Sequence, residues 1–400
     1  MASHLFSYGI IFFLLFIFFE FNTMRLSLII IFSALLVNTS FAQRNEYFLI
    51  TGTYTSGKSE GIYVFNYQLD KSVATPVFTA SGIKNPSFLT LSPDGKKLYA
   101  VSEMNGNGNA GKVVAYDFNR SSGALTKLNE QASGGDDPCY ILVDHSNKWV
   151  FVGNYSSGSL SVLPILPDGS LGVAKTTIKH SGSGADKNRQ EKAHVHATVI
   201  SPDNRFLFVP DLGIDKIMIY RFDEKDGTLK AAKQPFAETK PGAGPRHFTF
   251  HPNGKFAYIM EELSGSVTVF SYHAKSGELK PIQHISSLPN GFTGQAGSAD
   301  IHLSTDGKFL YASNRGESNT LVIYSVHPKD GKLSLLGHQS TLGKGPRNFS
   351  ITPDGKQLIV ANQGSDEMVI FNRNVETGML SDSGKRISVP TPVCIAWGVK

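Results

Sequence analysis

The chain has 400 residues, of which 40% are hydrophobic and 18% are charged, and this composition is that of an ordinary globular protein. It excludes a disordered or fibrous chain. The formal net charge is +5 and the lysines and arginines form no long run, so neither nucleic acid nor an anionic membrane is an expected partner.

Residues 1–42 differ from the rest of the chain because they are dominated by apolar runs. Met24 resembles a second start, and the apolar run 26–37 after it leads to the small residue Ala42. This pattern is typical of a secretory signal segment that starts at Met24 and is cleaved after Ala42. We therefore expect an exported protein, periplasmic or secreted, whose mature chain 43–400 is not inserted in a membrane. A tether formed by an uncleaved N-terminal segment is the alternative.

A five-residue turn motif recurs along the rest of the chain. Most copies contain Asp-Gly, Asn-Gly or Asp-Asn before a basic residue. The copies lie at 92–96, 144–148, 201–205, 251–255, 304–308 and 352–356. Gly and Asn tolerate a positive φ, so each copy predicts a tight hairpin turn between two strands.

A further strand recurs seven times and carries an aromatic or large apolar residue at a regular interval. These residues are Phe65, Tyr116, Leu163, Tyr220, Phe270, Tyr324 and Phe371. Their spacing of about 50 residues, with four short strands in each interval, is typical of a propeller blade. The chain is therefore predicted to be all-β, a seven-bladed β-propeller with four antiparallel strands per blade.

The two ends of the mature chain each supply part of one blade. Residues 47–54 resemble a second strand with no first strand before it, and residues 392–397 resemble a first strand with nothing after it. Pairing of these terminal strands would close the ring and remove exposed sheet edges. We therefore expect one domain, 43–400, closed by its two ends.

In a propeller, the connection that enters the first strand of a blade and the connection that leaves the second lie on the same face. The residues at the entry position are Ser87, Cys139, His196, Arg246, Ala299 and Arg347. Those at the exit position are Glu103, Tyr155, Leu212, Glu262, Arg315 and Gln363. Side chains at these two positions should converge on one mouth of the central channel.

The residue type at these two positions changes from blade to blade, whereas the turn motif is repeated. A purely structural role would favour the same residue type in every blade. His196, Arg246, Glu262 and Arg315 together supply an acid–base group, two fixed cations and a carboxylate. These four are our candidate catalytic residues. The alternative is a solvated rim in which the charges pair by chance.

Other motifs exclude several chemistries. His194 and His196 are spaced as two metal ligands on a strand, but no third ligand is apparent, so no metal site is expected. The Gly-rich segment 242–246 precedes no helix and is not a nucleotide loop. The absence of a Gly-x-Ser-x-Gly motif argues against covalent catalysis. Cys139 and Cys394 lie in apolar contexts and are predicted to be buried free thiols.

Several stretches resemble a known family over essentially the whole mature chain. They are residues 193–197, 201–205, 209–213, 244–247, 261–262, 299–303 and 313–316. The chain resembles the seven-bladed β-propeller lactonases, a family that includes bacterial 6-phosphogluconolactonases and fungal carboxymuconate cycloisomerases. The resemblance implies a catalytic site made of the residues that the blade positions select, namely His196, Arg246, Glu262 and Arg315.

The resemblance also implies an activity, the hydrolysis of a sugar lactone such as 6-phosphogluconolactone or a related aldonolactone. Glu262 or His196 would activate water, and Arg246 or Arg315 would stabilise the oxyanion. Further residues are expected to bind the substrate. They are His194, Arg347, Glu103, Tyr155 and Asn314. We expect an anionic sugar lactone as the partner, no cofactor, and a monomer or weak dimer.

Two other functions remain open. In a lactonising cycloisomerase, the same carboxylate and imidazole would move a proton at carbon while the arginines hold carboxylates. In a non-catalytic binding propeller, the mouth would be lined by aromatic and apolar groups rather than by charged ones. Product analysis with lactones and muconates separates the two enzymes.

Overall fold

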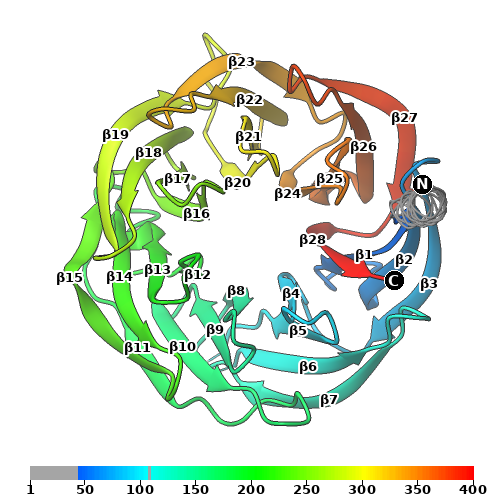
Figure 1. Ribbon diagram of the computed structural model, residues 1–400, viewed down its shortest axis with the longest axis horizontal. Helices are drawn as coiled ribbons and strands as arrows, with labels where there is room; N and C mark the ends of the chain where they lie inside the picture. Colours follow the sequence, from blue (N-terminus) through cyan, green and yellow to red (C-terminus); the bar gives the residue numbers. More distant parts are fainter. Residues whose placement is uncertain (1–43, 107–109) are drawn as a thin grey trace, which may run out of the picture. The chain divides into compact units, whose positions relative to one another are not determined.

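Strands make up nearly all the regular structure of the protein in this computed structural model, which describes residues 44–106 and 110–400. They form seven sheets of four antiparallel strands each. Figure 1 shows these sheets arranged as blades around a centre in the unit Glu46–Lys400, and the prediction of an all-β seven-bladed propeller is confirmed. The predicted signal segment, residues 1–42, lies outside the described residues.

Each blade runs from an inner strand at the centre of the ring to an outer strand at its edge (Figure 1). In this order, blade 1 contains β28 (Pro392–Val399), β1 (Glu46–Thr53), β2 (Gly61–Gln68) and β3 (Val73–Ser81). Blade 2 contains β4 (Leu89–Leu91), β5 (Lys97–Ser102), β6 (Lys112–Phe118) and β7 (Leu125–Ala132). Blade 3 contains β8 (Pro138–Val143), β9 (Trp149–Asn154), β10 (Ser159–Pro164) and β11 (Thr176–Lys179), and blade 4 contains β12 (Val199–Ile200), β13 (Phe206–Asp211), β14 (Lys216–Asp223) and β15 (Thr228–Glu238). Blade 5 contains β16 (Pro245–Phe250), β17 (Phe256–Glu261), β18 (Ser266–His273) and β19 (Glu278–Ser286). Blade 6 contains β20 (Ser298–Leu303), β21 (Phe309–Asn314), β22 (Thr320–Val326) and β23 (Leu333–Ser340). Blade 7 contains β24 (Pro346–Ile351), β25 (Gln357–Asn362), β26 (Glu367–Arg373) and β27 (Leu380–Ser388).

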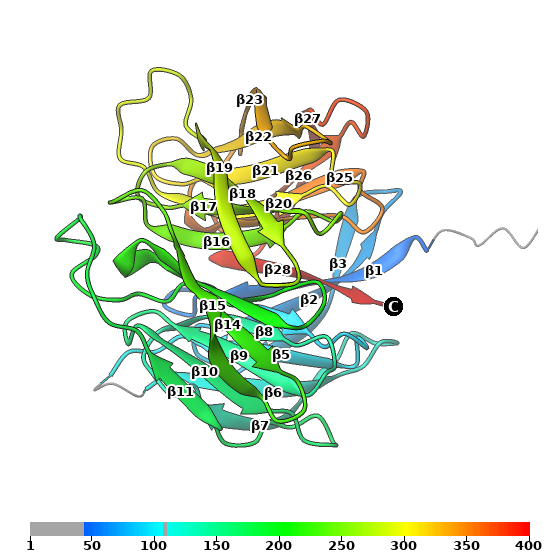
Figure 2. The ribbon, with the colours of Figure 1, turned by 60° about the vertical axis from the view of Figure 1, so that its left-hand side comes forward.

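The ring is closed by the two ends of the described chain, as predicted. Strand β1 pairs antiparallel with β28, and in this register Leu49 lies opposite Trp397. Figure 2 shows β28 beside β1 within the same sheet. Strand β1 is hydrogen-bonded on both sides, to β28 and β2, so the two ends of the described chain together complete blade 1.

The recurring turn motif forms the hairpins between first and second strands. In the first copy, the Ser92 hydroxyl accepts a hydrogen bond from the Lys97 amide at 2.9 Å, and Gly95 has a φ of +67°. Asn147 and Asn204 take the same left-handed conformation in two other copies, with φ of 59° and 60°. The motif therefore needs Gly or Asn at this point because other residues pay a steric cost there.

Packing between neighbouring blades provides the core. Seven clusters of buried apolar residues occur among the described residues, and each joins two adjacent blades. Between blades 4 and 5, for example, the rings of Phe208 and Phe248 stack at 5.5 Å. The only described helices are two three-residue 3-10 turns, η1 (Leu212–Ile214) and η2 (Gln363–Ser365), and neither could cross a membrane.

Candidate active site

The entry and exit positions of the blades converge on a cavity of about 620 Å³ at one mouth of the ring. Seven residues at these positions line it. They are Cys139, His196 and Arg347 from the entry position and Glu103, Tyr155, Glu262 and Arg315 from the exit position. The lining is rich in charge, unlike the apolar and aromatic mouth that a non-catalytic binding propeller would present.

A β-bulge explains why the entry residues leave the regular alternation of the first strand. The pairing of β16 with β17 shifts between Pro245 and His247, and Arg246 is the extra residue. The same shift occurs at Cys139 in β8 and at Arg347 in β24. A bulged residue is unpaired in the ladder and can be aimed away from the sheet. The bulge therefore delivers these side chains toward the mouth.

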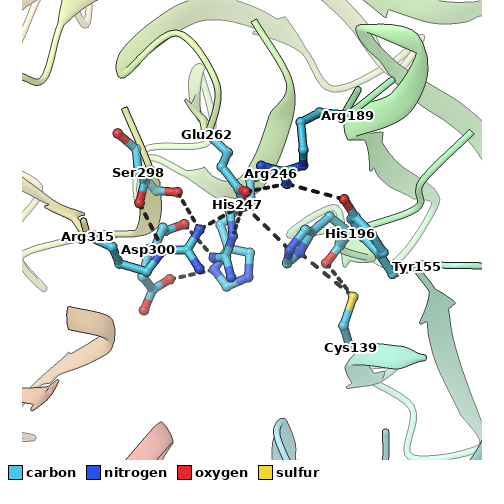
Figure 3. Close-up of polar contacts among 12 residues, drawn as sticks. Cys139, Tyr155, Arg189, His196, Arg246, His247, Glu262, Ser298, Asp300 and Arg315 are labelled. Carbon is cyan, nitrogen blue, oxygen red and sulfur yellow. Dashed lines mark hydrogen bonds and ion pairs between the residues drawn. The ribbon is translucent and has the colours of Figure 1, made fainter. Parts of the chain in front are cut away.

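The carboxylate of Glu262 lies at the centre of the site and binds three guanidinium groups (Figure 3). Its Oε2 accepts from Nε of Arg246 at 2.9 Å and lies 3.0 Å from Nη2 of Arg315. Its Oε1 accepts from Nη2 of Arg189 at 2.8 Å. Backbone carbonyls hold two of these cations in place, because Arg246 also donates to the oxygen of Ala299 and Arg315 to that of Gly297.

The charges of the arginines determine the protonation state of Glu262. Burial alone would raise the pKa of this carboxyl, but Arg315, Arg246 and Arg189 lower it to about 2. Burial, followed by the charges of Arg315 and Arg347, lowers the pKa of Arg246 to about 10. At neutral pH the cluster therefore contains an ionised carboxylate and charged guanidinium groups.

His196 lies beside this cluster and is surrounded by rings. Its Nε2 is 4.0 Å from Oε2 of Glu262, and its ring contacts Tyr155 and His247 edge to face, each at 5.5 Å between centroids. Burial and then the charge of Arg246 hold the pKa of His196 well below 6.5. The imidazole is therefore neutral at neutral pH.

A second polar group occupies another part of the cavity wall. The hydroxyl of Tyr54 donates to the carboxylate of Glu103 at 3.0 Å, and the guanidinium of Arg347 lies over the Tyr54 ring at 5.3 Å. Within the described residues, the guanidinium of Arg347 makes no hydrogen bond to another side chain or to the backbone. Its donors are therefore available to a ligand in the cavity.

Three of the predicted site residues do not line the cavity. Arg246 is 1% exposed and lies behind Glu262. His194 stacks on the ring of Tyr155 at 4.4 Å between ring centroids and is buried. Asn314 is fully buried, accepts from the hydroxyls of Ser287 and Ser298, and donates to the Ser287 carbonyl at 2.8 Å.

The position of Asn314 recurs in other blades with the same contact. Asn154 and Asn362 also end second strands, are fully buried, and donate from Nδ2 to the carbonyls of Ser133 and Thr341 at 3.1 Å. A contact repeated in three blades indicates that this asparagine ties each blade together. The structure therefore places Asn314 in the framework rather than at the mouth, where we had expected it to bind substrate.

The structure adds two residues to the site that the blade positions did not select. Tyr54 follows β1 and occupies the exit position of blade 1, but this blade has no turn motif because the chain ends interrupt it. Tyr54 follows β1 as Glu103 follows β5 and Tyr155 follows β9, so a comparison of these three strand ends would have identified Tyr54. Arg189 lies in the connection 180–198, which has no counterpart in the repeat, so a comparison of blade positions could not identify this residue.

Neither a metal cluster nor a disulfide occurs among residues 44–106 and 110–400. No three His, Cys, Asp or Glu side chains in this part of the chain form a group that could hold a metal ion. Cys139 and Cys394 are both buried and free, as predicted. Burial raises the pKa of the Cys139 thiol, so this residue is protonated beside His196 and is a poor nucleophile.

The fold and the whole length of the propeller match a known family. The family model described as lactonase, 7-bladed beta-propeller, matches residues 48–397. The chain belongs to this family. This lactonase-family chain is 37% identical over 351 residues to a 6-phosphogluconolactonase of Bacillus subtilis, covering 88% of this chain and 98% of the relative.

Two further relatives agree with this assignment. A 6-phosphogluconolactonase of Formosa agariphila is 40% identical over 335 residues, which are 83% of this chain and 94% of that one. The solved structure of a periplasmic gluconolactonase from Pseudomonas aeruginosa superimposes with a TM-score of 0.83 at 37% identity, covering 88% of the lactonase-family chain and 99% of its own. The sequence-based identification of the family is confirmed.

Proposed function

We propose that this protein hydrolyses a sugar lactone, and that its substrate is 6-phosphogluconolactone, which gives 6-phosphogluconate, or a related aldonolactone. The observation that carries the proposal is the juxtaposition of a neutral His196 with the Arg315–Glu262 pair on the wall of one open polar cavity. The names of the relatives support the lactone substrate, and none of the proposed steps needs a cofactor.

Arg315 is the oxyanion-stabilising residue in this proposal. Water attack on the lactone carbonyl places negative charge on its oxygen, and a preorganised cation at that point lowers the barrier. Arg315 lines the cavity, and its guanidinium is held by Glu262 and by the Gly297 carbonyl. Arg246 does not line the cavity, so it acts as a positioning residue that holds Glu262.

His196 is the general base rather than Glu262. Both oxygens of Glu262 are already bound by guanidinium groups, whereas the uncharged His196 imidazole lines the cavity and is not ion-paired. His196 takes a proton from water as the new carbon–oxygen bond forms. The ring carbon–oxygen bond then breaks, and the imidazolium returns the proton to the leaving alkoxide. Glu262 stays ionised and keeps the guanidinium groups in place.

Arg347 binds an anionic substituent of the substrate. A guanidinium can form two parallel hydrogen bonds with a phosphate or carboxylate. Arg347 lies over Tyr54 and lines the same cavity as His196. On the remaining cavity wall, Glu103 accepts hydrogen bonds from sugar hydroxyls and Tyr155 donates to them. His194 positions Tyr155 by stacking on its ring.

The protein acts outside the cytoplasm in this proposal. The apolar segment that ends at Ala42 supports export, and so does the likeness to a periplasmic gluconolactonase. Determination of the N-terminus of the protein recovered from the producing cells tests this part. A terminus at Gln43 is expected, and a terminus upstream of Met24 in a cytoplasmic fraction would contradict it.

The activity is tested with residues 43–400 and three substrates, namely gluconolactone, its 6-phosphate and a carboxymuconate. We expect acid release from one or both lactones well above the spontaneous rate, without added metal or cofactor. Lactone formation from the muconate would instead support a cycloisomerase. Failure to turn over any of the three would favour a binding protein.

A further inference from the structure

Arg189 reaches the mouth from outside the repeat, on the connection 180–198 between β11 and β12. The connection contains no helix or strand. Its backbone is nevertheless held firmly. The Asp186 side chain accepts from the amide of Asn188 at 2.9 Å, and the fully buried Gln190 donates to the Leu212 carbonyl at 2.8 Å and to Asp215 at 2.7 Å. The connection therefore fixes the Cα of Arg189 and leaves only its side chain free to move.

The guanidinium of Arg189 uses only part of its hydrogen-bonding capacity. Its Nη2 binds Oε1 of Glu262 at 2.8 Å and lies 3.4 Å from the Tyr155 hydroxyl, whereas Nε and Nη1 have no partner among the described residues. The side chain is 38% exposed, in contrast to the 2% of Arg246. Arg189 is thus the member of the cluster that can leave Glu262 at the smallest cost.

The proposed reaction creates a new charge at this point. A lactone carbonyl is uncharged, but ring opening by water converts it into a carboxylate and releases a proton. The new carboxylate forms beside Arg315, which binds Oε2 of Glu262, whereas Arg189 binds Oε1. Three guanidinium groups here face a single carboxylate, so an additional anion would be favoured.

We propose that Arg189 is a product-binding residue, which exchanges Oε1 of Glu262 for the carboxylate that ring opening creates. This inference rests on the proposed lactone hydrolysis. In the exchanged state Nε and Nη2 of Arg189 can form two parallel bonds with the product carboxylate, whereas Glu262 receives only one bond from Arg189. The aldonate should therefore bind more tightly than the uncharged lactone and inhibit the enzyme.

The test compares gluconate binding with gluconolactone turnover in four proteins. They are the wild type, Arg189→Gln, Arg189→Lys and the control Lys187→Gln, which removes a charge from the same connection without touching Glu262. Isothermal titration gives the dissociation constant of gluconate, and initial rates give kcat and KM for gluconolactone. Thermal melts of all four proteins verify that each is folded.

We expect Arg189→Gln to weaken gluconate binding about tenfold or more, because it removes a partly exposed, charge-assisted pair of bonds. Arg189→Lys should recover part of this loss because it keeps the charge but not the planar fork. KM for gluconolactone should change less than about threefold, since the lactone has no charge to pair. Lys187→Gln should match the wild type in both measurements.

Equal gluconate affinity in Arg189→Gln and the wild type would overturn the inference. An equal loss for gluconate and gluconolactone would also overturn it, because Arg189 would then bind the sugar and not the new carboxylate. Both interpretations require that the wild type hydrolyses gluconolactone. A wild type that binds gluconate but hydrolyses no lactone would instead contradict the proposed function.

Discussion

Nε of Arg246 donates to Oε2 of Glu262 across 2.9 Å, yet only Glu262 faces the cavity. The two residues belong to one hairpin of blade 5, and the β-bulge at Arg246 aims its side chain at the carboxylate. Arg246 is 1% exposed and has no access to bulk water to replace this partner. The two residues therefore have different roles: Glu262 lines the cavity, and Arg246 holds its carboxylate in place from behind.

Glu262→Gln should destabilise the protein and abolish most of its activity. Removal of one partner from a buried ion pair leaves the other charge unpaired, at a cost of about 3–5 kcal/mol in the free energy of unfolding. Urea denaturation measures this difference. Glu317→Gln is the matched control, because Glu317 is an exposed carboxylate on the same cavity wall. Equal stability of the two variants would show that the cluster around Glu262 contributes nothing to folding.

Replacement of Arg315 tests the oxyanion role. Arg315→Ala should lower kcat for the lactone by about 10²–10³, the effect of removing one preorganised donor. Its side chain is 19% exposed, so the fold should tolerate the change better than loss of Arg246. Steady-state kinetics with gluconolactone give the answer, and an unchanged kcat would assign the oxyanion to another group.

The pH dependence of kcat/KM tests the role of His196. A general base must be unprotonated, so the rate falls as the pH drops through the pKa of the imidazole in the free enzyme. Burial and Arg246 place this pKa well below 6.5, and the acid limb of the profile should therefore lie below pH 6.5. His196→Asn should slow the reaction by about 10²–10⁴ and remove the limb. An acid limb at or above pH 6.5 would point to a different base.

Arg347 should determine the preference for an anionic substrate. Arg347→Gln is expected to reduce kcat/KM for the 6-phosphate of gluconolactone by about 10–100-fold, because a charge-assisted bond to phosphate is lost. The unphosphorylated lactone should be little affected. Arg120→Gln, at an exposed arginine that donates to the Val399 carbonyl, is the control. The same loss for both lactones would rule out a phosphate contact.

Asn314 should behave as a framework residue. Asn314→Ala removes an acceptor from two buried serine hydroxyls and should cost about 1–3 kcal/mol of stability. Asn362→Ala in blade 7 should cost less, because Asn362 shares with Asn314 only the bond from Nδ2 to a backbone carbonyl. Both variants should keep the wild-type KM. A raised KM in Asn314→Ala alone would restore the predicted substrate contact.

The ring and the place of its site were predictable because they depend on periodicity. The turn motif requires Gly or Asn at a left-handed position, and seven regularly spaced large residues, such as Tyr116 and Phe371, required seven blades. Residues that break this repeat at the mouth, such as His196 and Glu262, were identified for the same reason. The roles of these residues remain predictions until variants are measured.

Other features depend on local geometry that the repeat does not encode. A bulge adds one residue to a strand without a distinctive residue type, so the burial of Arg246 behind Glu262 could not be read from spacing. Arg189 lies in an irregular connection whose path depends on the buried amide of Gln190. Asn314 stands beside Arg315 in the sequence, but strand alternation turns it into the blade.

A structure of the protein with gluconolactam, a non-hydrolysable analogue of the lactone, would show whether Arg315 binds the lactone carbonyl oxygen. We expect the ring to lie in the cavity between His196 and Arg347, with its carbonyl oxygen accepting a hydrogen bond from Arg315. An analogue bound in this cavity with its carbonyl directed away from Arg315, or bound elsewhere on the propeller, would contradict this expectation.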